Sequence, residues 1–256
     1  MSGFPTAFHI GPFVFHTYGL GLAIAAFVTY SYAQKRLERA TWPTEKWGRF
    51  TGWMIASGLV GARLANIFTN WDYYRADPGR WFSVWQGGLA SFGGIALALI
   101  VGIPLFRRYW PKMSLLEFCD CIVPALIAGW ALGRVLGPQF MVNGGGHLTH
   151  QWFGIHYQGQ FGKRVPVPLI QGAEDGLLWA ALLALSRSKW SRIPGRICGI
   201  GMIVWGLVRS LDEKLLLGQQ SHSGSDGVQI AGLLLALGGL VVVARSFRRS
   251  NEAPAA

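Results

Sequence analysis

Seven apolar stretches recur along the chain, separated by short polar and mostly basic stretches. Each is close to the roughly 20 residues that a helix needs to cross a hydrocarbon core of about 30 Å. None of them alternates apolar and polar residues as a half-buried strand does, and only helices or closed barrels can span a bilayer. The pattern therefore predicts an all-α polytopic membrane protein with seven transmembrane helices, at residues 11–32, 50–70, 88–109, 117–140, 168–186, 197–217 and 227–244.

Composition excludes the main soluble classes. Of the 256 residues, 14% are Asp, Glu, Lys or Arg and 51% are hydrophobic, whereas about a quarter of a soluble protein is charged. The mean hydropathy is +0.32. These values exclude a soluble globule, a disordered chain, a coiled coil and a disulfide-stapled scaffold. The first stretch lacks Lys and Arg before Lys35 and lacks an Ala-x-Ala-like cleavage site, so we expect a retained helix rather than a signal peptide.

Basic residues lie mostly on one side of the predicted bundle, and cytoplasmic loops collect Lys and Arg. Five are on one side: Arg75, Arg80, Lys163, Arg164 and Lys214. Fifteen are on the other: Lys35, Arg36, Arg39, Lys46, Arg49, Arg107, Arg108, Lys112, Arg187, Lys189, Arg192, Arg196, Arg245, Arg248 and Arg249. We therefore predict an external N-terminus and a cytoplasmic C-terminus. One transmembrane domain would cover residues 1–245, with an external loop at 143–167 and a short basic cytoplasmic tail at 246–256.

The net charge of +11 does not indicate a nucleic-acid partner. The basic residues occur in short runs between apolar stretches instead of along one face. They are better interpreted as signals of membrane topology.

Three arginines fall inside predicted spans, where a charge costs several kcal/mol. At 1.5 Å per residue, Arg63 lies about 21 Å from Arg49, and Arg134 and Arg209 reach a similar height in their own spans. Glu174 enters span 5 from the opposite direction and comes to a comparable depth. Other polar or glycine-containing turns at this level carry Tyr18, His16, Gly93 and Gly94. The inner half of the bundle offers little beyond Asp120 and the cysteines.

This outward-facing polar layer has two interpretations. Ionisable residues within membranes usually mark function, and a guanidinium binds phosphate through two parallel hydrogen bonds, so the ligand would be anionic and amphiphilic, such as a phospholipid. Alternatively, the arginines pair with Glu174, Asp175, Asp212 and Glu213 to hold the bundle together. Likewise, Gly93 and Gly94, with the glycines of span 2, can serve close helix packing instead of a ligand.

Neither a metal nor a cofactor is expected from the remaining residues. The external loop holds His147, His150 and His156, but a His-x-x-His pair in a Gly-rich loop is a weak metal signal, and we interpret these as ordinary loop histidines. Cys119, Cys121 and Cys198 lie near predicted cytoplasmic ends, where thiols stay reduced, and are interpreted as core residues.

Several ordered motifs resemble those of bacterial prolipoprotein diacylglyceryl transferase, a seven-helix enzyme family. The resemblance runs nearly from end to end. It rests on His9-Ile-Gly-Pro12, His16-Thr-Tyr-Gly-Leu20, Gly61-Ala-Arg63, Asp77-Pro78, Trp85-Gln-Gly-Gly88, Gly93-Gly94, Gly133-Arg134, Gln171 through Glu174, and Trp205-Gly206 through Arg209 and Glu213.

The chain departs from the family pattern at chemically important positions. Phe92 stands where the family has the histidine of a His-Gly-Gly motif, and a phenyl ring cannot accept a proton. The signature after Arg134 is stretched, so that Asn143 arrives about three residues late. Ala173 and Trp205 replace two expected tyrosines.

The resemblance implies transfer of diacylglyceryl from phosphatidylglycerol to the lipobox cysteine of prolipoprotein signal peptides, by a multi-pass protein of the bacterial plasma (inner) membrane. Arg134 and Arg209 would hold the phosphate, Tyr18 would position the head group, and His16, His147 or His150 would replace the lost base. The other expected substrate-binding residues are Arg63, Gly93, Gly94, Asn143, Gln171, Glu174 and Glu213. The partners would be the lipid, the signal peptide and the bilayer.

Two other functions stay open on the sequence alone. The chain could bind phospholipid without catalysis, or with altered specificity, and Phe92 is the residue that separates this from the enzyme. A transporter is the weaker alternative, because the sequence shows no inverted repeat and the polar layer stops short of the inner half.

Overall fold

The structure is a computed structural model that describes residues 7–10, 13–83, 90–136, 144–217 and 225–252. Most of these residues are helical. Seven helices of 17 residues or more lie in this part of the chain: α1 (Thr17–Arg39), α2 (Trp47–Thr69), α4 (Ser91–Tyr109), α5 (Leu115–Leu136), α6 (Val167–Ser186), α7 (Arg196–Asp212) and α8 (Ser225–Glu252).

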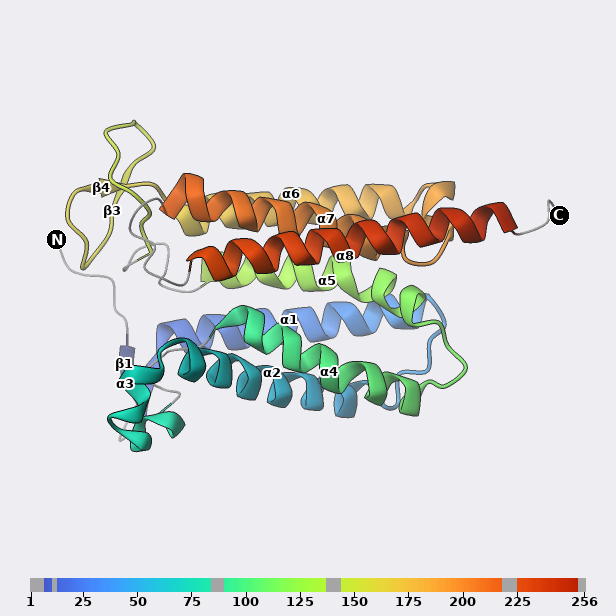
Figure 1. Cartoon of the computed structure of the whole chain (residues 1–256), viewed down its shortest axis with the longest axis horizontal. Coiled ribbons are helices and arrows are strands. Elements are labelled where there is room, and N and C mark those ends of the chain that lie inside the picture. The colour runs from blue at the N-terminus through green and yellow to red at the C-terminus, as the bar shows by residue number, and fades with distance from the viewer. Residues whose placement is uncertain (1–6, 11–12, 84–89, 137–143, 218–224, 253–256) are drawn as a thin grey trace. The chain divides into compact units, whose positions relative to one another are not determined.

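Short elements precede the first long helix or lie between later ones (Figure 1). They are the antiparallel pairs β1 (Ala7–Ile10) with β2 (Phe13–His16) and β3 (Ile155–His156) with β4 (Lys163–Arg164), the helix α3 (Trp71–Arg75), the 3-10 helices η1 (Pro78–Phe82) and η4 (Lys189–Arg192), and the π-helical turn η5 (Glu213–Leu217).

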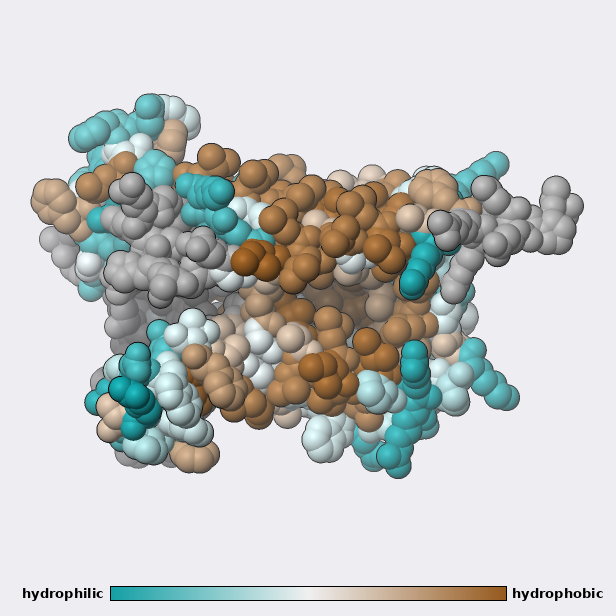
Figure 2. Space-filling view, in the orientation of Figure 1, coloured by the Kyte–Doolittle hydropathy of each residue, from teal (hydrophilic) through white to brown (hydrophobic). Residues whose placement is uncertain are grey.

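The helical content agrees with the predicted all-α membrane protein. Among the described residues, three helices are long and apolar enough to cross a membrane, over Phe92–Tyr109, Leu115–Leu136 and Gly227–Phe247. Figure 2 shows a largely hydrophobic face over α7 and α8. On α8, Leu234 is 63% exposed within this chain, and an apolar surface of this kind suits contact with lipid. Seven spans and their orientation stay predictions.

The first predicted span is wrong at both ends. The sequence pattern placed it at 11–32, whereas residues 13–16 form strand β2 and the helix runs from Thr17 to Arg39. The apolar window ends where Gln34 and Lys35 begin, but these residues are good helix formers, and Gln34 donates a hydrogen bond to Glu38 over 2.8 Å. Hydropathy therefore indicated a helix in this part of the chain but not where it begins and ends.

The chain forms two compact units, residues 41–115 and residues 1–40 with 116–256. In the first unit, α2 and α4 pack at glycines. A Cβ on Gly93 would lie 2.1 Å from Ala65 Cβ, and one on Gly61 would lie 2.5 Å from the Gly93 carbonyl oxygen. A Cβ on Gly94 would lie 2.9 Å from the Gly58 carbonyl oxygen. These glycines allow two helix backbones to approach each other.

The second unit contains α1, α5, α6, α7 and α8. Helices α7 and α8 also meet at glycines, since a Cβ on Gly206 would lie 2.4 Å from the Gly232 carbonyl oxygen. The start of α7 is fixed by Asp120 of α5, whose carboxylate accepts hydrogen bonds from the backbone N–H of Gly195 (2.6 Å) and of Cys198 (2.7 Å). Asp120 therefore caps the N-terminus of a helix other than its own.

Candidate functional site

Arg209 is the centre of a buried polar cluster between α6 and α7. Its side chain is 5% exposed, and its guanidinium lies 3.0 Å from Asp175 Oδ1, 3.1 Å from Asp212 Oδ2 and 3.7 Å from Glu174 Oε2. Arg209 and Asp212 are three residues apart on α7, so they share one face of that helix. We call Gln171, Glu174, Asp175, Arg209 and Asp212 the arginine cluster.

Gln171 completes the cluster and lies one turn before Asp175 on α6. Its side-chain amide donates to Asp212 Oδ2 over 3.0 Å, and its backbone carbonyl oxygen accepts from Arg209 Nη2 over 3.4 Å. The indole ring of Trp205 lies 5.7 Å from the guanidinium carbon, within the range of a cation–π contact. The cluster is therefore held by both helices and by an aromatic face.

Arg134 of α5 lies beside the same turn of α6. A Cβ at Gly172 would lie 3.6 Å from the Arg134 Cβ, which is an ordinary contact distance, so the two residues are direct neighbours. The Arg134 charge also interacts favourably with Asp175. The structure thus brings both predicted phosphate-binding arginines to Asp175.

Several buried atoms of the arginine cluster make no hydrogen bond to the residues that the structure describes. They are Gln171 Oε1, Glu174 Oε2, Asp175 Oδ2 and Arg209 Nε. Buried polar atoms are hydrogen-bonded in nearly all proteins, so these are the groups that water or a polar ligand would satisfy. Three are acceptors, which suit hydroxyl donors, and Arg209 Nε is a donor, which suits an anionic oxygen.

The charge balance limits which ligands the cluster accepts. Two arginines face three carboxylates there, so the fully ionised set carries one excess negative charge. An anionic phosphate would therefore need a proton on one carboxylate or a rearrangement of the ion pairs. Among the described residues, no group of three or more His, Cys, Asp or Glu side chains is arranged to hold a metal ion.

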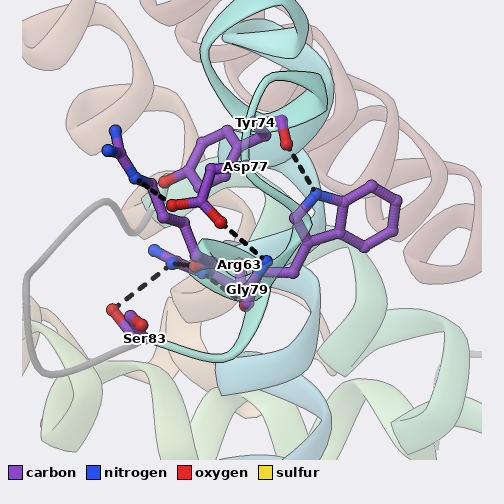
Figure 3. Close-up of polar contacts among 7 residues, drawn as sticks. Arg63, Tyr74, Asp77, Gly79 and Ser83 are labelled. Carbon is purple, nitrogen blue, oxygen red and sulfur yellow. Dashed lines mark hydrogen bonds and ion pairs between the residues drawn. The ribbon is translucent and has the colours of Figure 1, made fainter.

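The Arg63 side chain forms hydrogen bonds to backbone carbonyl oxygens of the compact unit that contains it (Figure 3). Its guanidinium donates to the carbonyl oxygens of Trp81 (3.0 Å) and Ser83 (3.3 Å), and also to that of Arg80. It lies 5.0 Å from the centre of the Tyr74 ring. The side chain therefore holds the end of η1 against α2, and its predicted contact with substrate stays a prediction.

The same segment is braced by a second acidic cap, also visible in Figure 3. Asp77 accepts from the backbone N–H of Gly79 over 3.1 Å and from Arg80 Nε over 2.9 Å. Trp81 Nε1 donates to the Tyr74 carbonyl over 3.1 Å. The Asp77-Pro78 motif thus starts η1, with Asp77 as its N-cap.

The other predicted site residues lie at helix ends and in the loop at 143–167. His16 ends β2, and Tyr18 is in the first turn of α1. His147 is partly buried, with Nδ1 3.0 Å from the Leu148 carbonyl oxygen. Its backbone N–H donates to Leu216 in η5, the turn that begins at Glu213.

Phe92, Gly93 and Gly94 lie in the first turn of α4. Gly93 and Gly94 contact α2, as the packing interpretation expects, and their contact with substrate stays a prediction. Phe92 stands in place of the expected base. Asn143 lies outside the described residues.

Asp175 and Asp212 make the two shortest ion pairs of Arg209. The sequence named both as partners that hold the arginines within the bundle, and the structure shows the pairing of Arg209 that this interpretation predicts. The available signal was an acidic pair in each of two apolar stretches, Glu174 with Asp175 and Asp212 with Glu213. The face of the helix that each residue occupies decides which member of a pair turns inward.

The comparisons with known proteins agree on one family. The family described as prolipoprotein diacylglyceryl transferase matches residues 5–245. The chain is 30% identical over 218 residues to the phosphatidylglycerol–prolipoprotein diacylglyceryl transferase of Ehrlichia ruminantium (strain Welgevonden), with 82% of each chain covered. The protein of that name from Tolumonas auensis is 25% identical over 93% of this chain and 94% of its own.

A third relative extends the similarity almost to both ends. The Pseudomonas aeruginosa (strain LESB58) protein of the same name is 27% identical over 98% of this chain and 97% of its own. The match thus includes all seven long helices and the arginine cluster. The chain belongs to the prolipoprotein diacylglyceryl transferase family of transferases.

Proposed function

We propose that this protein transfers the diacylglyceryl group of phosphatidylglycerol to the lipobox cysteine of prolipoproteins, the first step of lipoprotein maturation, in the bacterial inner membrane. Its relatives are named for this donor and acceptor. The observation that carries the proposal is the buried arginine cluster, with Arg134 beside it and hydrogen-bonding atoms turned inward.

The reaction exchanges one bond to the glyceryl carbon for another. The cysteine sulfur attacks the glyceryl carbon that carries the phosphate, the carbon–oxygen bond breaks, and glycerol phosphate leaves. The thiol proton is released, and the departing phosphate can take it up. A thiol of pKa about 8.5 is mostly protonated at neutral pH, so a base or a cationic field must favour the thiolate.

We assign the arginines to the phosphate and the loop residues to the thiol. Arg134 and Arg209 would stabilise the charge that develops on the leaving phosphate in a dry site. The acceptor oxygens of Gln171 and Glu174 suit the hydroxyl groups of a glycerol head group. His147 or His16 would take the thiol proton, with Tyr18 and Glu213 near the head group.

Two observations favour a second candidate, a phospholipid-binding protein without transferase activity. Phe92 cannot act as a base. In addition, Arg209 is already paired with carboxylates at 3.0 and 3.1 Å, which a phosphate would have to displace. This candidate keeps the lipid and loses the thioether product.

One assay decides between them. Purified protein is supplied with phosphatidylglycerol labelled in its acyl chains and with a lipobox peptide, and the thioether-linked peptide is detected by mass spectrometry. We expect product that requires the peptide cysteine, since a Cys→Ser peptide offers no thiol. Saturable lipid binding without product would establish the second candidate instead.

A further inference from the structure

An apolar groove runs along the seam between α6 and α7, directly from the arginine cluster. It has a volume of about 380 Å³. From α6 it is lined by residues three or four positions apart, from Glu174 to Leu185, and from α7 by Ile200, Val204 and Val208. Both helices therefore contribute one continuous stripe.

The floor of the groove is well packed, and a small side chain in its middle leaves it open. Leu178 and Leu182 are 8% and 1% exposed, so they fill the space beneath. Gly201 admits Leu182, because a Cβ there would lie 3.4 Å from Leu182 Cδ1. Ala181 is the smallest side chain among the described lining residues, and it keeps the middle of the groove open.

Polarity along the groove is strongly one-sided. Among the described residues that line it, Glu174 alone is ionisable, and it lies at the end next to Arg209. Its Oε2 atom makes no hydrogen bond to the described residues. The groove thus joins a polar end to a hydrocarbon end, which is the shape of an amphiphile.

The groove is about as long as one acyl chain in a bilayer. Glu174 and Leu185 are eleven residues apart, about 16 Å along a helix. Half of a hydrocarbon core of about 30 Å is about 15 Å. A lipid whose head group contacts the arginine cluster can therefore lay one acyl chain along the full groove.

We propose that this α6–α7 groove binds one acyl chain of the phospholipid whose head group contacts the arginine cluster. The inference rests on the proposed lipid substrate and names where its tail lies. Lipid tails are as apolar as Leu, so the groove supplies packing and position instead of hydrophobic affinity. Its contribution would be to hold the glyceryl carbon in place while the head group reacts.

The test uses phosphatidylglycerol with a photoreactive diazirine in the middle of one acyl chain, added to the full-length protein in lipid vesicles. Peptides from residues 177–185 and 200–208 are expected to carry the label. Ala181→Trp should reduce that labelling on the order of tenfold, because the indole fills the groove. Ala180→Trp is the matched control, since Ala180 is exposed on α6 and does not line the groove.

The rate of diacylglyceryl transfer is a second measurement on the same variants. Ala181→Trp should reduce transfer from long-chain phosphatidylglycerol by roughly 10- to 100-fold, as a displaced substrate does, while transfer from a short-chain analogue is retained. Leu177→Trp, at a groove residue that is 72% exposed, repeats the experiment if Ala181→Trp fails to fold.

The outcomes separate the groove from the proposed function. Labelling that is equal in all variants, or as strong on the exposed face of α8, would overturn the groove proposal even if transfer is normal. Labelling that a lipobox peptide displaces, while unlabelled phosphatidylglycerol does not, would assign the groove to the peptide and also overturn it. Groove labelling without any transfer would support the groove and refute the transferase.

Discussion

The guanidinium of Arg209 is held by carboxylates of α6 and of its own helix α7, and this arrangement gives it a structural role beside the phosphate contact proposed above. Arg209→Ala would leave Asp175 and Asp212 buried without their counter-ion, which costs about 3 to 5 kcal/mol in comparable buried pairs. We expect a lower unfolding temperature in detergent, partly restored by adding Asp175→Asn. Arg107→Ala, at an exposed arginine, is the control.

Arg209→Lys separates the two roles. Lysine keeps the charge but loses the planar fork, so stability should be largely retained while phosphatidylglycerol binding weakens. If Arg209→Lys binds the lipid as the wild type does, the phosphate contact assigned to Arg209 is wrong.

Phe92 tests whether the expected base is needed. If its absence limits the reaction, Phe92→His should raise diacylglyceryl transfer, by roughly 100-fold when the geometry is right. Phe92→Gln, which is polar but not a base at neutral pH, is the control and should not have this effect. Equal rates for the three proteins, with loss of transfer in His147→Ala, would place the base in the external loop instead.

Tyr157 in the external loop gives a pH dependence. Burial raises the pKa of Tyr157 to about 12 from its ordinary value of 10, so the folded state favours the neutral phenol. The resulting stability is present below pH 10 and is lost as the pH rises from about 10 to about 12. Tyr157→Phe should remove this alkaline loss, as followed by unfolding temperature against pH. An unchanged alkaline loss in that variant would contradict the assignment.

Sequence analysis identified the residues of the arginine cluster but not their pairing. Glu174 and Asp175 are adjacent, and one residue is about 100° around a helix, so the choice between them depends on how α6 is rotated against α7. The pairing of residue 171 with 212 and of 175 with 209 fixes that rotation. It comes from packing between segments some 35 residues apart, which hydropathy does not encode.

At the scale of elements, the contact of α2 with α4 is governed by glycines. Gly93→Ala would bring a methyl group against Ala65, and such overpacking costs about 1 to 3 kcal/mol. We expect a lower unfolding temperature. Gly52→Ala on α2 is the control, because no atom lies within 4 Å of the added methyl group and alanine favours the helix.

The same pair of variants tests the predicted substrate contact of Gly93. A Gly93→Ala protein that keeps its stability but binds phosphatidylglycerol more weakly would contradict the packing role and favour the ligand role.

The sequence predicted where the long helices lie, but not where each of them ends or which of them are the most apolar. Four of the seven predicted stretches, at 50–70, 88–109, 117–140 and 168–186, coincide with a long helix to within a few residues at their described ends. Helices α1 and α8 extend well past the stretches at 11–32 and 227–244, and the stretch at 197–217 is α-helix only to Asp212 and continues as η5. Helices α6 and α7, which carry the arginine cluster, both lie outside the set of described helices that are long and apolar enough to cross a membrane.

At the scale of the whole molecule, the prediction concerns topology. Fifteen basic residues against five predict a periplasmic N-terminus and a cytoplasmic C-terminus across seven spans. Alkaline phosphatase folds actively only outside the cytoplasm, so a fusion at Ala256 should be inactive and one in the 143–167 loop active. The opposite pair of activities would invert the orientation and remove the external face from the proposed site.

The carboxylate of Asp120 has a consequence at the far end of α7. It fixes where α7 begins, and Arg209 stands thirteen residues after Arg196, about 20 Å further along the same helix. Any slide of α7 against α5 at this cap would carry the Arg209 guanidinium with it. A single carboxylate at one end of α7 therefore sets the position of the arginine cluster near the other end, and the alignment of the cluster depends on contacts at both ends of the helix.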